Sequence, residues 1–311
     1  MSILVIKLLT SILLMTSLMD CQSIDKKFFP NFETFSKQVN NVEIYGVKGG
    51  SGPPLLLLHG HPESHLEWHL VASELAKNFT VIASDLRGYG HSSAPKGSAS
   101  HVEYSKREMA KDQVLLMESF GYKKFHVCAH DRGARVTHRM AMDWPDRLER
   151  AMLLDIAPTL AMYELTDQKF ATAYWWWFFL IQPSPIPENF INARPDWWID
   201  NRFPRPTEET EEFKKTLRNP AYVHAVCEDY RASATIDLDH DRRDREQGLK
   251  VQCPLRVLWG QNGTIGRLFH ALDLWHTVAV NVTGRAVPSG HDIPELVPDI
   301  LLDEVYEFFR V

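Results

Sequence analysis

The sequence predicts an α/β fold in which a mostly parallel central sheet is flanked by helices and interrupted by a helical insertion. Short apolar runs, typical of strands buried on both faces of a sheet, alternate with longer stretches of helical character. That alternation stops between residues 158 and 250, where prolines separate helical stretches that contain five tryptophans. The first pattern indicates the sheet, and the second indicates the insertion.

Four short apolar runs are expected strands, at residues 55–58, 81–84, 152–155 and 255–259, and residues 42–47 and 124–129 are also expected to be strands. A helix is expected at 105–120. The predicted organisation is a core of residues 24–157 and 251–311, with residues 158–250 as a helical cap. A Trp-rich cap over the carboxyl ends of the strands would enclose an apolar pocket that excludes water. The charged stretch 237–246 is expected to face solvent.

Composition narrows the class of protein. The chain has 311 residues, and 34 Lys+Arg against 40 Asp+Glu give a net charge of −6, so nucleic-acid binding is not expected. A hydrophobic content of 44% with 11% aromatic residues excludes a disordered chain. The four cysteines form no CxxC pair and indicate neither a disulfide scaffold nor a structural zinc site. An enzyme or a binding protein remains.

Residues 1–23 resemble a targeting segment. Lys7 precedes an uncharged run at 8–19 that is too short for a transmembrane helix and fits the core of a signal peptide. Export by cleavage near Ser23 is expected, with lipid attachment at Cys21 as one alternative. The other alternative is a cytoplasmic protein that keeps an apolar N-terminal helix.

Residues 129–133, Ala-His-Asp-Arg-Gly, have the layout of a nucleophile elbow, with Asp131 in the nucleophile position. They follow a predicted strand and begin a helix, so the carboxylate would stand at the strand tip near the positive end of the helix. A simple helix N-cap is the alternative for an aspartate at such a turn. His61 follows the 55–58 strand, and His291 lies near the C-terminus. Nucleophile before histidine is the chain order of α/β-hydrolases.

With these residues in view, the sequence resembles the haloacetate (fluoroacetate) dehalogenases of the α/β-hydrolase superfamily, from about Val42 to the C-terminus. The most specific motif is residues 130–135, His-Asp-Arg-Gly-Ala-Arg. The resemblance implies that Asp131 is the nucleophile and His291 the base. It implies Asp155 as the acid, because residues 260–263 after the later strand contain no carboxylate. The amides of His61 and Arg132 would form the oxyanion hole.

Two arginines follow the predicted nucleophile. The guanidinium groups of Arg132 and Arg135 could hold a substrate carboxylate that Asp131 would otherwise repel. Surface salt bridges are the alternative role for both side chains.

The resemblance also implies a halide pocket in the cap. Trp177 and Tyr230 match the tryptophan and tyrosine of relatives that cleave carbon–fluorine bonds, whereas Trp176 stands where those relatives have a histidine. An indole has one N–H donor and more bulk than an imidazole, so the pocket would be reshaped. Chloride and bromide, as better leaving groups, would depend less on this pocket. Simple packing within the cap is the alternative for all three residues.

The expected function is therefore hydrolytic dehalogenation of short 2-halocarboxylates to 2-hydroxy acids through an aspartyl ester. One alternative is an epoxide hydrolase that uses Asp131 with Tyr230 and either Tyr174 or Tyr163. Another is a carboxylate-binding protein without catalysis. No motif implies a cofactor, and a homodimer is a family-level expectation. The histidines of the 59–69 segment are not expected to bind a metal, because no carboxylate or cysteine completes a recognised pattern; they are His59, His61, His65 and His69.

Overall fold

The computed structural model describes residues 23–203 and 206–309. The predicted targeting segment therefore lies outside the described residues, except for Ser23. Within the described part of the chain, every helix is too short or too polar to cross a lipid bilayer.

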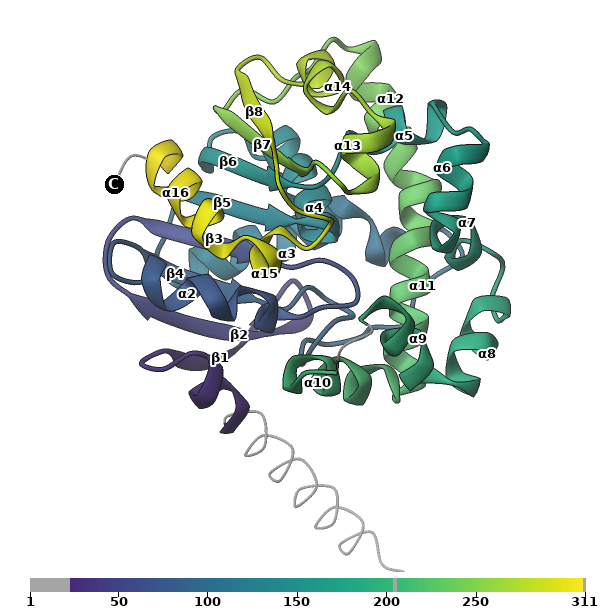
Figure 1. Ribbon diagram of the computed structural model, residues 1–311, viewed down its shortest axis with the longest axis horizontal. Coiled ribbons are helices and arrows are strands. Elements are labelled where there is room, and N and C mark those ends of the chain that lie inside the picture. Colours follow the sequence, from purple (N-terminus) through teal and green to yellow (C-terminus); the bar gives the residue numbers. More distant parts are fainter. Residues whose placement is uncertain (1–22, 204–205, 310–311) are drawn as a thin grey trace, which may run out of the picture.

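One sheet of eight strands forms the centre of the molecule, in the spatial order β1-β2-β4-β3-β5-β6-β7-β8 (Figure 1). The strands β1 and β2 run antiparallel to their neighbours, and all other pairs are parallel. In chain order they are β1 (Glu33–Val39), β2 (Val42–Gly50), β3 (Pro54–Leu58), β4 (Thr80–Ser84), β5 (Phe125–His130), β6 (Leu148–Leu154), β7 (Leu255–Gly260) and β8 (Val282–Val287).

All six strands expected from the sequence are confirmed, and two more, β1 and β8, were not predicted. Both lie at the edges of the sheet, and most of their side chains are exposed or partly exposed. A strand exposed on one face carries no continuous apolar run, so the pattern that identifies the inner strands is missing there.

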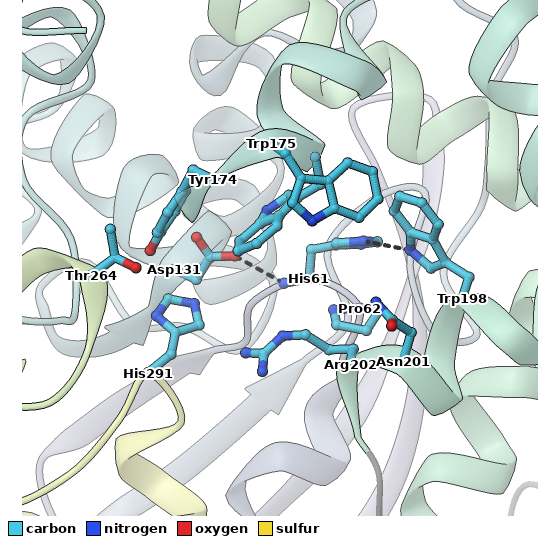
Figure 2. Close-up of a pocket in the computed structure, with 11 residues that line it drawn as sticks. His61, Pro62, Asp131, Tyr174, Trp175, Trp198, Asn201, Arg202, Thr264 and His291 are labelled. Atoms are coloured by element: carbon cyan, nitrogen blue, oxygen red, sulfur yellow. Dashed lines mark hydrogen bonds between the residues drawn. The ribbon is translucent and has the colours of Figure 1, made fainter. Parts of the chain in front are cut away.

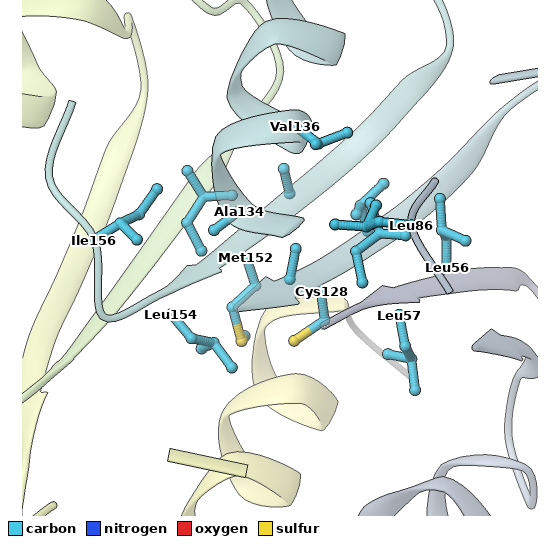
Figure 3. Packing of buried hydrophobic residues seen from close by; sticks show 14 of the residues in the cluster. Leu56, Leu57, Leu86, Cys128, Ala134, Val136, Met152, Leu154 and Ile156 are labelled. Carbon is cyan, nitrogen blue, oxygen red and sulfur yellow. The ribbon is translucent and has the colours of Figure 1, made fainter. Parts of the chain in front are cut away.

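The inner strands are buried on both faces because helices cover each side of the sheet. Figure 1 shows α2 (His69–Leu75) and α16 (Pro298–Phe309) in front of the sheet, with α3 (Lys106–Ser119) and α4 (Asp131–Asp143) behind it. The predicted helix at 105–120 is thus confirmed as α3, whose first turn is capped by the Ser105 hydroxyl. Figure 3 shows the packing on both faces, with Ala134 of α4 on one side and Cys128 of β5 turned to the other.

The described residues between β6 and β7, where the sequence predicts a cap, form eight helices. They lie together beside the edge of the sheet at which the parallel strands end (Figure 1). They are α5 (Thr159–Glu164), α6 (Gln168–Ala173), α7 (Trp175–Leu180), α8 (Ile186–Ala193), α9 (Pro195–Arg202), α10 (Glu208–Leu217), α11 (Pro220–Ala234) and α12 (Ile236–Glu246). Shorter helices α13 (Thr264–Leu268), α14 (Ala271–Val278) and α15 (Ile293–Leu296) follow β7 and β8.

The expectation that residues 237–246 face solvent is wrong for part of α12. Asp237 is buried and its Oδ1 accepts a hydrogen bond of 2.9 Å from the backbone N–H of Lys106. Asp241 and Asp244 pair with Arg139 of α4. The charged residues suggested a solvent-facing helix, but several of them pair with residues of the core that lie about a hundred positions away in the sequence.

Candidate active site

Asp131 stands on a strained turn between β5 and α4. Its backbone φ is +39°, in the left-handed region that a non-glycine residue rarely occupies. Two glycines leave the space for this turn: a Cβ on Gly133 would lie 2.5 Å from the Leu58 carbonyl oxygen, and one on Gly60 would lie 2.8 Å from the Asp131 Cβ. The turn has the form of a nucleophile elbow and presents the carboxylate beyond the end of the strand.

His291 and Asp155 form a hydrogen-bonded pair beside this turn. Asp155 follows β6 directly, with φ at +49°, and its Oδ2 lies 2.5 Å from His291 Nδ1. The other carboxylate oxygen accepts a 2.8 Å hydrogen bond from the Gly260 amide, which holds the group in place. His291 lies in the loop after β8. The structure thus brings together the three residues that the sequence predicts as nucleophile, acid and base.

The surroundings of Asp131 favour its ionised form. Burial raises the pKa of this carboxyl, but the positive charges of His291, Arg132 and Arg135 outweigh burial and hold the pKa well below its usual range. The backbone N–H of His61 donates to Asp131 Oδ2 at 3.2 Å (Figure 2). An amide aimed at this oxygen is placed where an oxyanion hole requires a donor.

A cavity of about 230 Å³ opens in front of Asp131. Figure 2 shows the carboxylate between His291, His61 and the ring of Tyr174, with residues of the inserted helices on the far wall. Burial lowers the pKa of His61 to about 3, so its ring is neutral at pH 7 and its Nε2 accepts a 3.4 Å hydrogen bond from the Trp198 indole. The lining residues are His61, Pro62, Asp131, Tyr174, Trp175, Trp176, Trp198, Asn201, Arg202, Thr264 and His291.

Arg132 is fully buried and is held by α11. Its Nε and Nη2 each donate to the Asp229 carboxylate at 2.8 Å, and Nη2 also donates to the Ser233 hydroxyl at 2.6 Å. Its guanidinium lies over the Tyr230 ring, 4.1 Å from the centroid. The fork expected to bind a carboxylate therefore binds Asp229, and only Nη1 is left without a hydrogen-bond partner.

Arg135, one turn further along α4, is also buried. Its Nη1 donates to the Ala157 carbonyl and the Thr159 hydroxyl, and its guanidinium lies 4.6 Å from the Trp177 ring. Among the described residues, neither its Nε nor Trp177 Nε1 has a hydrogen-bond partner. With Arg132 Nη1, three buried N–H donors are unpaired, on residues that lie behind the wall of the cavity and do not line it. Buried donors are costly to leave unpaired, so the arrangement suits a small anion.

The predicted halide pocket divides in the structure. Trp176 lines the cavity and stacks on Tyr174, with ring centroids 4.7 Å apart. Trp177 and Tyr230 are each about 1% exposed and lie deeper, against the two arginines. Trp176 therefore borders the cavity, whereas Trp177 and Tyr230 lie in the interior of the cap.

Two features of the site were missed from the sequence. Asp229, the residue before Tyr230, is the counter-ion of Arg132 and offsets the cost of burying its charge. Arg202 lines the cavity and pairs with Asp292, the neighbour of His291. No sequence pattern indicates Arg202, because its place depends on how α9 packs over the sheet.

Comparison with known proteins identifies the family. A family model described as the alpha/beta hydrolase fold matches residues 53–188. The chain is 43% identical over 280 residues to a fluoroacetate dehalogenase of Burkholderia sp, which covers 87% of this chain and 91% of that protein. The chain belongs to the alpha/beta hydrolase family.

Two further similarities agree with this assignment. A soluble epoxide hydrolase of Corynebacterium sp. (strain C12) is 30% identical to this alpha/beta hydrolase over 302 residues, 87% of this chain and 95% of that one. The crystal structure of a proposed alpha/beta hydrolase from Nostoc sp PCC 7120 superimposes with a TM-score of 0.88 at 48% identity. It covers 90% of this chain and 99% of that one. The fold class predicted from the sequence is confirmed.

Proposed function

We propose that this alpha/beta hydrolase is a hydrolytic dehalogenase that converts short 2-halocarboxylates into 2-hydroxy acids and halide. The observation that carries the proposal is the position of Arg132 and Arg135, each with one unpaired donor, beside the ionised Asp131. A carboxylate nucleophile repels an anionic substrate, and buried guanidinium groups offset that repulsion. The likeness to the fluoroacetate dehalogenase of Burkholderia sp supports the same reaction.

In the first step, one oxygen of Asp131 attacks the carbon that carries the halogen, from the side opposite to the halogen. A carbon–oxygen bond forms, the carbon–halogen bond breaks with its electron pair, and halide leaves. Arg132 Nη1 and Arg135 Nε hold the substrate carboxylate during the attack. This step requires no proton transfer, which fits a nucleophile held ionised.

In the second step, His291 takes a proton from water through Nε2, while its Nδ1 is held by Asp155. The hydroxide attacks the ester carbonyl of Asp131, and the backbone N–H of His61 stabilises the oxyanion. The ester bond then breaks, His291 returns the proton to the departing alkoxide, and the 2-hydroxy acid leaves. The Asp131 carboxyl loses its remaining proton to solvent, which regenerates the ionised nucleophile.

The leaving halide accepts hydrogen bonds from the cap. Trp177 Nε1 is buried and has no partner, so it is free to donate to an anion. The Tyr230 ring lies beside the Trp177 ring, with centroids 6.5 Å apart. Trp176, on the cavity side, adds bulk and a single donor in place of an imidazole, which favours chloride and bromide over fluoride as the leaving group.

The test is halide release from fluoroacetate, chloroacetate and bromoacetate by the full chain. Asp131→Asn removes the nucleophilic charge at nearly constant volume and is expected to abolish release. Asp196→Asn, at an exposed ion pair with Arg218, is the matched control and should release halide as the wild type does. Absence of release from all three acids by folded wild-type protein would refute the proposal.

Isotope labelling distinguishes the ester route from direct attack by water. In a single turnover in ¹⁸O-water, the ester route places the label in the Asp131 carboxylate and an unlabelled oxygen in the product. Direct displacement by water would place the label in the hydroxy acid at once, and that result would overturn the role of Asp131.

Epoxide hydrolysis is the second candidate. The 30% identity to the soluble epoxide hydrolase and the position of Tyr174 on the cavity wall favour it. A tyrosine hydroxyl there could donate to an epoxide oxygen while Asp131 opens the ring. Turnover of styrene oxide without release of halide from chloroacetate would select this reaction, and binding of chloroacetate without turnover of either compound would indicate a carboxylate-binding protein.

A further inference from the structure

A buried cluster of two carboxylates and one imidazole lies directly behind the nucleophile. Glu63 and Glu67 come from the segment after β3, and His130 is the last residue of β5. They are 2%, 1% and 0% exposed. One side-chain donor atom from each lies within 4.8 Å of the other two. The reaction proposed above uses none of these three side chains.

Only some of the carboxylate oxygens and imidazole nitrogens of this cluster have a hydrogen-bond or ion-pair partner. Glu67 Oε2 accepts a 3.0 Å hydrogen bond from the Gly60 amide, and Glu67 Oε1 lies 2.6 Å from His130 Nδ1. In contrast, Glu63 Oε2 and His130 Nε2 are buried without a hydrogen-bond partner. A buried carboxylate oxygen with no donor is expensive and calls for a ligand that the described side chains do not supply.

Gly60 packs closely against this cluster. A Cβ on Gly60 would lie 2.8 Å from the Asp131 Cβ, 3.0 Å from Glu63 Oε2 and 3.2 Å from His130 Nδ1, so only a glycine fits here without a shift. His130 ends β5 and Glu67 lies in the short helix at His65–Trp68, whereas Glu63 lies in the loop before that helix. Two of the three side chains are therefore held by regular secondary structure.

Of the carboxylates around the cluster, two already have a basic partner. Asp292 accepts hydrogen bonds from Arg202 Nη1 and Nη2, and Glu67 Oε1 lies against His130 Nδ1. Glu63 Oε2 makes no hydrogen bond with the residues that the structure describes. Glu63 is therefore the carboxylate with an oxygen available for a ligand.

We propose that Glu63, Glu67 and His130 form a divalent-cation site, with Zn²⁺ as the ion that fits best. Zinc is commonly bound by imidazole nitrogen and carboxylate oxygen in four-coordinate sites. Three protein ligands leave a fourth position, and Asp292 lies beside it, since His130 also forms a group of donor atoms with His291 and Asp292 within 4.8 Å. The sequence does not predict the site because its ligands come from two segments about seventy residues apart.

Occupation of this site would slow catalysis. The His130 and His291 rings lie 4.5 Å apart between centroids, so a dication on His130 would place positive charge behind the base. The same charge would make Asp131 a weaker nucleophile. The effect on rate rests on the proposed function, whereas binding of the ion does not.

Binding is measured first, on the chelator-treated full chain. Equilibrium dialysis against Zn²⁺ is expected to show about one tightly held ion per chain. Co²⁺ in its place should give visible absorption bands characteristic of a four-coordinate ion. Glu63→Gln and Glu67→Gln, which keep the side-chain volume, should each lose that equivalent and those bands. Glu295→Gln is the matched control, because this carboxyl lies near the cluster but is not a ligand, and it should keep both.

Three results would overturn the proposal: no zinc retained by the wild type, equal retention by the two glutamine variants, or Co²⁺ bands unchanged in them. Circular dichroism shows whether each variant is folded. Glu63→Gln is the safer variant, since Glu63 Oε2 makes no hydrogen bond that would be lost.

The rate is measured second, with chloroacetate or the substrate that the assays above select. Zinc should inhibit the wild type and the Glu295→Gln variant, and inhibition should weaken in Glu63→Gln. If zinc binds stoichiometrically but no substrate is turned over, the dehalogenase proposal fails while the metal site stands.

Discussion

Asp229 is the residue on which the position of Arg132 depends. It is fully buried, and its carboxylate accepts two 2.8 Å hydrogen bonds from Arg132, one of 2.6 Å from the Tyr89 hydroxyl and one from the Lys106 ammonium. Replacing Asp229 with Asn keeps the shape but leaves two buried cations with no charged partner there. We expect a large loss of stability and a rise in the KM for haloacetates, because the guanidinium would no longer be held beside Asp131.

The size of the loss follows from the geometry. Two unit charges about 4 Å apart in an effective dielectric of about 20 attract by roughly 4 kcal/mol, and Asp229 faces two cations. Part of this gross attraction is offset because the unfolded carboxylate is well hydrated. Measured losses on breaking one partner of a buried ion pair are about 3–5 kcal/mol, which we take as the expected loss for Asp229→Asn.

Urea unfolding, followed by tryptophan fluorescence, measures this loss. With a slope of about 3 kcal/mol/M, the midpoint should fall by about 1–1.7 M. Asp237→Asn is the matched control, since Asp237 lies in the same buried cluster, but its Oδ2 stands 3.7 Å from the Lys106 ammonium and makes no hydrogen bond with the described residues. A loss below about 1 kcal/mol for Asp229→Asn, or one no larger than that of Asp237→Asn, would refute the reasoning.

Three further predictions follow from the same geometry. His291→Asn removes the base but not the nucleophile, so it should release a single equivalent of halide and then stop, with the ester on Asp131 visible by mass spectrometry; steady turnover would contradict this. Trp176→His restores an imidazole donor and should raise the ratio of fluoride to chloride release by roughly tenfold, since a hydrogen bond to a charged group contributes about 1.5–3 kcal/mol; an unchanged ratio would place the halide elsewhere. Burial raises the pKa of Asp237 to about 6 in the folded protein. The folded state then binds a proton that the unfolded chain loses between about pH 4 and pH 6, so the wild type should lose stability relative to Asp237→Asn as the pH rises through that window. Parallel stability curves for the two proteins would show that Asp237 does not titrate in this way.

Periodicity and turn chemistry in the sequence predict most of the core. Inner strands such as β3 and β4 are nearly continuous apolar runs because helices cover both of their faces, and this pattern identified them. The elbow at Asp131 was predictable because small residues at its flanks are required by contacts closer than a side chain allows, as at Gly133. Edge strands β1 and β8 carry no such run, and were missed.

Side-chain partners across long sequence separations could not be predicted in this way. The pairing of Asp155 with His291 was expected from the resemblance. The ion pair of Arg132 with Asp229 depends instead on the packing of separate elements. The same is true of the short distance between Glu63 and His130. The same holds for Trp176, which lines the cavity, while its neighbour Trp177 is buried.

The sequence by itself therefore determines the strands, the elbow and the types of residue that reach the carboxyl ends of the sheet, because these depend on local pattern. Only the tertiary structure decides which donors are left free. Whether a buried polar atom finds a hydrogen-bond partner depends on which other polar atoms pack around it. Among the described residues, Arg132 Nη1, Arg135 Nε and Glu63 Oε2 are atoms without such a partner.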